Sequence, residues 1–152
     1  MSAAGRAKLF VLAIAVIVAA SCAQTLQGNA RIAEAFARRA SGFEVTADGV
    51  VERLLSDEPG PDGTHERFVM RLDGSTQTVL VAHNISIASR APVAVGDQVM
   101  VHGEYVWNEQ GGLIHFTHHD PQRRHEDGYI VLGGKRYSRS GGQPDASRID
   151  ES

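Results

Sequence analysis

His65-Glu66-Arg67-Phe68-Val69-Met70-Arg71-Leu72 alternates between polar and apolar side chains. In an extended chain, Phe68, Met70 and Leu72 point to one side, and the basic side chains between them point to the other. This period of two is typical of a β-strand that buries one face. The stretch therefore predicts a β-rich domain whose core contains these three apolar residues.

The same kind of pattern continues on both sides of this stretch. The apolar run 50–55 predicts a preceding strand, and the turn between the two strands is expected over 56–63, where Pro and Gly cluster. Asp73-Gly74 predicts the next turn, and 84–95 is expected to be a longer connection. Three further strands are predicted over 77–83, 98–107 and 113–119.

This order of elements predicts a mainly β fold, a small five-stranded OB-like Greek-key barrel with a short N-terminal helix. A small sandwich or an SH3-like barrel would give a similar pattern. The helix is expected over 30–40, where Ile32, Ala35 and Phe36 recur at helical spacing. In an OB barrel the strands neighbour one another in the order one, two, three, five, four, one, with the third and fifth parallel. The core should also contain Val99, Val101, Ile114 and Phe116, whereas His102, of opposite parity, should be exposed.

The N-terminus predicts export. Arg6 and Lys8 precede an apolar run over 9–20, which suits a secretory signal better than a membrane-spanning helix. We therefore expect a signal peptide over 1–23, followed either by cleavage to a free N-terminus or by acylation of Cys22 at a lipobox. The product would be periplasmic or anchored in the cell envelope, with membrane contact only through the lipid. The other expected divisions are a helix and linker over 24–45, the OB-like β-barrel domain over 46–138 and a disordered tail over 139–152.

Composition excludes several classes of function. The chain has 15 Lys and Arg residues against 18 Asp and Glu residues, a formal net charge of −3. Removing the signal removes two cations and no acid, and −3 − 2 gives −5. A general nucleic-acid binder relies on clustered cations, so no such binding is expected. Cys22 is the only cysteine, which leaves the mature domain without a thiolate nucleophile or ligand.

Histidines concentrate near the end of the predicted fifth strand, where four of the chain's seven lie within 115–125. Neutral imidazole and carboxylate groups bind divalent metals and transfer protons near neutral pH. The predicted topology brings several distant strand ends to one rim, although a single histidine is more often structural than functional. The candidate ligand or metal residues are His65, His83, His118, His119, Asp120 and His125, with Asn84, Asp97, His115, Arg67 and Glu104 in supporting positions. Zinc with four ligands is the simplest cofactor that this set predicts.

Several short motifs accompany these residues, among them His65-x-x-Phe68, Ala82-His83-Asn84-Ile85, Gly96-Asp97, Gly103-Glu104-Tyr105-x-Trp107-Asn108 and Thr117-His118-His119-Asp120-Pro121. In these motifs, residues 49–137 resemble an uncharacterised family of small exported bacterial proteins, known only as a domain of unknown function. Phe116 and Tyr129 stand where members of that family carry Trp. The resemblance implies export and a shared polar site, and it implies no activity.

Together these features favour an exported periplasmic binding module of OB type with a histidine-rich rim site for a divalent metal or small ligand. A metal-dependent phosphodiesterase or nuclease is an alternative, but the negative charge of the mature chain disfavours a polyanionic substrate. A structural or partner-binding domain of the envelope is another, which acylation of Cys22 would favour. The sequence has no nucleophile elbow and no phosphate-binding glycine loop, and it does not decide between enzyme and binder.

Overall fold

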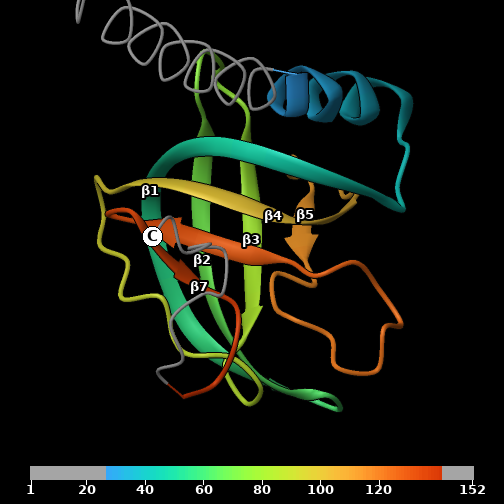
Figure 1. Cartoon of the computed structure of the whole chain (residues 1–152). Coiled ribbons are helices and arrows are strands. Elements are labelled where there is room, and N and C mark those ends of the chain that lie inside the picture. Colours follow the sequence, from blue (N-terminus) through green and yellow to red (C-terminus); the bar gives the residue numbers. More distant parts are fainter. Residues whose placement is uncertain (1–26, 142–152) are drawn as a thin grey trace, which may run out of the picture.

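Residues 27–141 are described in the computed structural model (Figure 1). A helix over 27–38 leads into the strands β1 (Phe43–Gly60), β2 (Gly63–Leu72), β3 (Thr78–Asn84), β4 (Gln98–Val106), β5 (Leu113–His115), β6 (Tyr129–Leu132) and β7 (Lys135–Tyr137). The predicted signal peptide, Cys22 and the predicted tail from residue 142 onward lie outside the described residues. Within 27–141, no helix is long and apolar enough to cross a membrane.

All seven strands belong to one sheet, in the order β1-β2-β3-β5-β4-β6-β7. β1 pairs with β4 as well as with β2, so the pairings among β1 to β5 close into a ring. β3 and β5 are parallel, and the other paired strands are antiparallel. The fold is therefore mainly β with one short helix, as predicted, and the predicted order of neighbours among the first five strands is confirmed.

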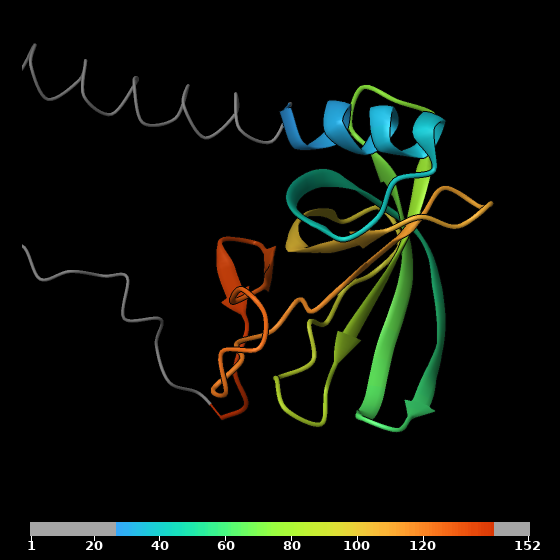
Figure 2. The same ribbon diagram turned by 90° about the vertical axis from the view of Figure 1, so that its right-hand side faces the viewer.

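The hydrophobic core lies between the strands of this ring, because alternate residues of each strand turn inward. Phe68, Met70 and Leu72 of β2 are fully buried, which confirms the prediction made from their spacing. The helix lies across one end of the ring (Figure 2) and buries Ile32. Gly28 allows this helix to approach β1 closely, since a Cβ at position 28 would lie 1.7 Å from the backbone oxygen of Thr46. Val99, Val101 and Ile114 are also buried, as predicted.

β1 is longer than predicted at both ends. The apolar run at 50–55 is only its middle, since the strand extends from Phe43 to Gly60. Its first half pairs with β4 and buries Val45 and Ala47. These two small apolar residues form only a weak alternating pattern, so the sequence did not predict this part of the strand. Its second half continues through the predicted turn because only β2 flanks it there, and an edge strand tolerates Pro59.

β5 is shorter than predicted, because it ends at His115 and not at 119. Phe116 has a φ of 53°, which interrupts the extended chain. The chain then forms a long loop, residues 116–128, before β6 and β7, two strands that the sequence pattern did not predict. The placement of Phe116 in the core was also wrong. Its half-buried ring stacks between those of His115 and His125, with centroid distances of 4.0 and 4.3 Å.

Candidate functional site

Three of the predicted rim histidines lie near one another. His83 ends β3, His65 lies near the start of β2, and His118 lies in the 116–128 loop. Burial is the main reason that the pKa of His83 is lowered to about 4, and the proximity of His118 and His65 adds to the effect. Burial also lowers the pKa of His118. The imidazoles of His83 and His118 are therefore neutral at pH 7, as metal binding requires.

Both nitrogens of His83, however, already have partners. Nε2 lies 3.0 Å from the carbonyl oxygen of Ser89, which can only accept, so Nε2 carries the proton. Nδ1 lies 2.8 Å from Oγ1 of Thr117 and accepts the hydroxyl hydrogen. The side chain is fully buried. His83 thus serves as a structural link between β3, the connection after it and the 116–128 loop.

Asp120 is also occupied within the protein. Its carboxylate accepts hydrogen bonds from the backbone N–H groups of Gln122, Arg124 and His125, an arrangement that holds the turn in the 116–128 loop. Burial acts to raise the pKa of Asp120, but these donors and the Arg124 charge outweigh it and lower the pKa to about 2. The carboxylate has little capacity left for a metal ion.

The remaining predicted ligands have separate partners. His119 Nδ1 lies 2.6 Å from Oδ2 of Asp127, and His65 Nε2 lies 3.6 Å from Oδ2 of Asp62. His125 Nδ1 donates to the carbonyl oxygen of Glu126, while its Nε2 is buried without a hydrogen-bond partner, 3.8 Å from Asp120 Oδ2.

Three supporting residues also have local roles. Asn84 donates to the carbonyl oxygen of Asp62, Asp97 accepts the backbone N–H of Ala94, and Arg67 pairs with Glu58. Across the described chain, the predicted rim residues do not supply three ligand atoms that lie within 4.8 Å of one another. The structure therefore brings His65, His83 and His118 near one another and gives most of the predicted rim residues separate partners within the protein.

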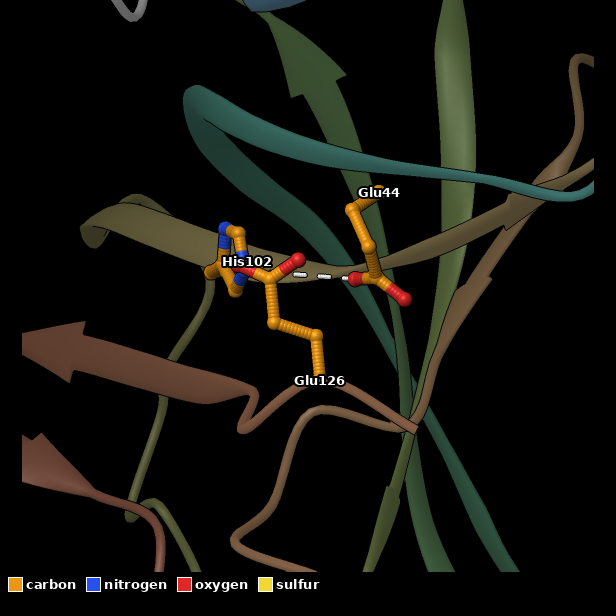
Figure 3. A group of neighbouring side chains, drawn as sticks. All are labelled: Glu44, His102 and Glu126. Atoms are coloured by element: carbon orange, nitrogen blue, oxygen red, sulfur yellow. Dashed lines mark ion pairs between the residues drawn. The ribbon is translucent and has the colours of Figure 1, made fainter. Parts of the chain in front are cut away.

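Such a group does form on the outer side of the sheet, from Glu44, His102 and Glu126 (Figure 3). Glu44 comes from β1, His102 from β4 and Glu126 from the 116–128 loop. Nε2 of His102 lies 3.4 Å from Oε1 of Glu126 and 3.9 Å from Oε2 of Glu44. The three ligand atoms all lie within 4.8 Å of one another.

The group contains two carboxylates and no cationic side chain of its own. Burial, supported by the nearby Arg136, lowers the pKa of His102, so the imidazole is neutral at pH 7 and neutralises neither carboxylate. Burial, and the carboxylates of Glu126 and Glu104, raise the pKa of Glu44. Oε2 of Glu44 is buried and has no hydrogen-bond partner. A buried carboxylate oxygen without a donor is costly, and a cation between these side chains would remove that cost.

Two neighbours fix the orientation of the His102 ring. Oγ1 of Thr46, directly across the β1–β4 pair, lies 2.7 Å from Nδ1. The ring of Tyr129 in β6 stacks on the His102 ring with a centroid distance of 5.1 Å. Arg136 of β7 in turn lies over the Tyr129 ring, 3.6 Å from its centroid. When Nδ1 donates to Thr46, the lone pair of Nε2 points at the carboxylates, which is the tautomer that binds metal.

The local sequence pattern does not reveal this group, for identifiable reasons. His102 was expected to be exposed because of its parity, but its side chain is only 14% exposed, covered by β6 and the 116–128 loop. Glu44 lies in the part of β1 that the apolar pattern did not reveal, and Glu126 lies in a loop. The one available signal was the pair His102 and Glu104, two polar side chains on the same face of a well-defined strand.

The model of a protein family described as "Protein of unknown function (DUF3465)" matches residues 13–138. The chain belongs to this family. The match covers every strand of the sheet and all three members of the Glu44–His102–Glu126 group. No curated protein and no solved structure matches the chain. Membership of DUF3465 agrees with the resemblance to an uncharacterised domain and assigns no activity.

Proposed function

We propose that this protein is an exported binding domain of OB type that holds a divalent metal ion at Glu44, His102 and Glu126. The proposal for the fold rests on the closed ring of pairings among β1 to β5, with β3 and β5 parallel and a long connection between β3 and β4. The proposal for export rests on the signal-like N-terminal sequence, with a periplasmic or lipid-anchored product.

The observation that carries the metal proposal is the buried Oε2 of Glu44, which has no hydrogen-bond donor and faces a neutral imidazole and a second carboxylate. Two carboxylates and one neutral imidazole carry a charge of −2, which a divalent cation balances. Nitrogen and carboxylate oxygen are the ligands that first-row divalent ions accept. The site therefore has the charge and the ligand types that such an ion needs.

The spacing of the ligand atoms favours zinc. Bond lengths near 2.0–2.2 Å and tetrahedral angles place neighbouring ligand atoms about 3.3 Å apart. The observed separations of 3.4 and 3.9 Å between His102 Nε2 and the carboxylate oxygens are close to this value. Three protein ligands leave a fourth position for water or a small ligand. Glu126 is 63% exposed, so this position is open to solvent.

A metal titration followed by thermal unfolding tests the proposal. Zn²⁺ should raise the melting temperature of the chelator-treated protein in a concentration-dependent way, because the ion binds only the folded chain. Glu126→Gln keeps the side-chain shape and removes one anionic ligand, so it should weaken Zn²⁺ binding by at least about 100-fold, more than the loss of a residue that only hydrogen-bonds to a ligand usually does. Glu109→Gln, in the exposed turn between β4 and β5, should behave like the wild type.

Variants of the rim histidines provide the opposing test. His118→Ala removes an imidazole that is not part of the Glu44–His102–Glu126 group, so the Zn²⁺-dependent shift should survive in it. If the shift is lost in His118→Ala and kept in Glu126→Gln, the rim residues hold the metal. If Zn²⁺, Cu²⁺, Ni²⁺ and Mn²⁺ all leave the melting temperature of the wild type unchanged, the domain does not bind these metals.

A further inference from the structure

The second half of β1 is an open edge of the sheet. β1 pairs with β4 only over 43–50, whereas it pairs with β2 as far as Gly60. Figure 2 shows the resulting β1–β2 hairpin extending away from the ring at the end opposite the helix. Glu44 of the proposed metal site lies in the other half of β1. The open edge is therefore a separate feature, whose backbone groups are available to another strand.

The backbone of Leu54 points toward this open edge. The N–H of Val51 donates to the carbonyl oxygen of Asp97, and the carbonyl oxygen of Val51 accepts from the N–H of Gly96. Both groups of Val51 therefore point away from β2, and this orientation recurs at every second residue of a regular strand. One extra residue is bulged between Val51 and Arg53, so the orientation returns at Leu54.

The open stretch is short, and Leu54 lies at its centre. It begins after Val51, whose backbone is already bonded, and it ends at Ser56, where the register of β1 and β2 shifts. The carbonyl oxygen of Ser56 accepts from Nε of Arg67 and keeps a second lone pair. Leu54 is 48% exposed, although it lies directly opposite the fully buried Phe68. The edge thus presents an apolar side chain at the middle of residues 52–56.

The side chains of this edge complement a second copy of the same edge. In antiparallel register, with Leu54 opposite Leu54 of the second copy, Arg53 lies opposite Leu55 and residue 52 opposite residue 56. No like charges of this stretch then face each other, which would destabilise the pair. Arg53 has no ion pair within residues 27–141, and this register brings it toward the acidic residues 57–58 of the second copy.

We propose that two copies of this protein associate through the open edges of β1, in antiparallel register about a two-fold axis at Leu54. The N–H of each Leu54 donates to the carbonyl oxygen of the other, and the two side chains pack together. A closed two-fold dimer uses the same patch on both copies, and it covers the edge that each copy leaves open. The contact is small, so the dissociation constant should be on the order of 100 µM.

Sedimentation equilibrium at increasing protein concentration tests the dimer. The whole protein carrying Cys22→Ser is used with a chelator present, so that neither a lipid, a disulfide nor a metal ion links the copies. Leu54→Lys places two like charges at the axis and should weaken association by at least about 10-fold. Ile87→Lys changes another exposed apolar side chain, at 40% exposure in the β3–β4 connection, and should associate like the parent. Melting curves establish that each variant is folded.

The register has a separate signature. Leu54→Cys, made together with Cys22→Ser, carries the only thiol of the chain. Directly opposite residues of a hydrogen-bonded antiparallel pair have Cα atoms about 5.5 Å apart, a distance that a disulfide spans. With oxidised glutathione, Leu54→Cys should form linked dimers at least about 10-fold faster than Glu109→Cys, whose exposed thiol in the β4–β5 turn reacts by collision alone.

Three results would overturn the dimer. The first is a protein that stays monomeric at every concentration, which would leave the edge to a strand of a different protein. The second is association that survives Leu54→Lys or that Ile87→Lys weakens equally, which would indicate non-specific hydrophobic contact. The third is equal cross-linking of Leu54→Cys and Glu109→Cys.

Discussion

Thr46 on β1 and His102 on β4 face each other across an antiparallel strand pair, with Oγ1 of Thr46 2.7 Å from Nδ1 of His102. The contact connects the regular part of the sheet to the group formed with the 116–128 loop. Since an imidazole has two nitrogens, the partner of one decides which way the other is presented. Thr46 is therefore a positioning residue for the proposed metal site.

Replacing Thr46 with Val should weaken metal binding without removing a ligand. The shape of the side chain is kept and the hydrogen bond to Nδ1 is lost, so Zn²⁺ affinity should fall by about 10–100-fold, the usual effect of such an outer contact. Competition with a chromogenic chelator measures this. Thr46→Ser retains the hydroxyl and should bind nearly as well as the wild type. Equal affinities for Thr46→Val and Thr46→Ser would show that the hydroxyl does not orient the ring.

The pKa of His83 predicts a loss of stability in acid. The folded pKa of about 4 lies below the value of 6.5 for a free histidine, so the unfolded chain binds more protons between these values. The stability that neutral His83 contributes is present above pH 6.5 and is lost as the pH falls toward 4. The difference of about 2.5 units between the two pKa values corresponds to a loss of about 3 kcal/mol in the free energy of unfolding. Urea unfolding of metal-free protein at several pH values measures it.

His83→Asn is the matched variant for that experiment. It removes the titrating group, so the change in unfolding free energy between pH 6.5 and 4 should shrink by about 3 kcal/mol. The variant will be less stable at pH 7, because it loses the contacts to Thr117 and Ser89. The pH dependence, and not the absolute stability, decides the prediction. An unchanged pH dependence in His83→Asn would mean that other groups cause the acid sensitivity.

Glu66 should act in the opposite direction. Burial raises its pKa from 4.5 to about 6, so the folded state holds the proton more tightly, and stability falls as the pH rises through 6. In Glu66→Gln the amide oxygen still accepts the backbone N–H of Ala91, and the buried charge is gone. Above pH 6 the variant should be more stable than the wild type by on the order of 1 kcal/mol, allowing for solvent screening. Chemical denaturation at pH 8 and pH 4.5 checks this, and the advantage should disappear at the lower pH.

Two phenylalanines should differ sharply in their contribution to stability. Phe68 is fully buried in the core, and Phe68→Ala should lower the free energy of unfolding by about 3–5 kcal/mol. Phe116 is half-buried outside the core, so Phe116→Ala should cost about 1–2 kcal/mol, and Arg67→Ala well under about 1 kcal/mol. Urea unfolding of the three variants gives the order. A Phe116→Ala variant as unstable as Phe68→Ala would place Phe116 in the folding core after all.

The sequence by itself determined the parts of this protein that depend on local pattern. Side chains alternate along a strand with a period of two, so Phe68, Met70 and Leu72 identified both a strand and its buried face. Turn residues such as Asp73-Gly74 separated the strands, and their order was enough to predict which ones are neighbours. The strands and turns need only residues close together in the chain, and the order of neighbours followed from the OB topology that their succession suggested.

The tertiary structure alone decided the site. Whether His102 is exposed depends on β6 and the 116–128 loop, which return over β4 from farther along the chain. The meeting of Glu44 and Glu126 beside it requires β1 to begin at Phe43 and β5 to end at His115, and neither boundary has a strong local signal. The conspicuous histidines include His83 and His118, and both form hydrogen bonds with the 116–128 loop or within it. A buried polar group needs a hydrogen-bond partner, and the tertiary structure decides which partner is close enough.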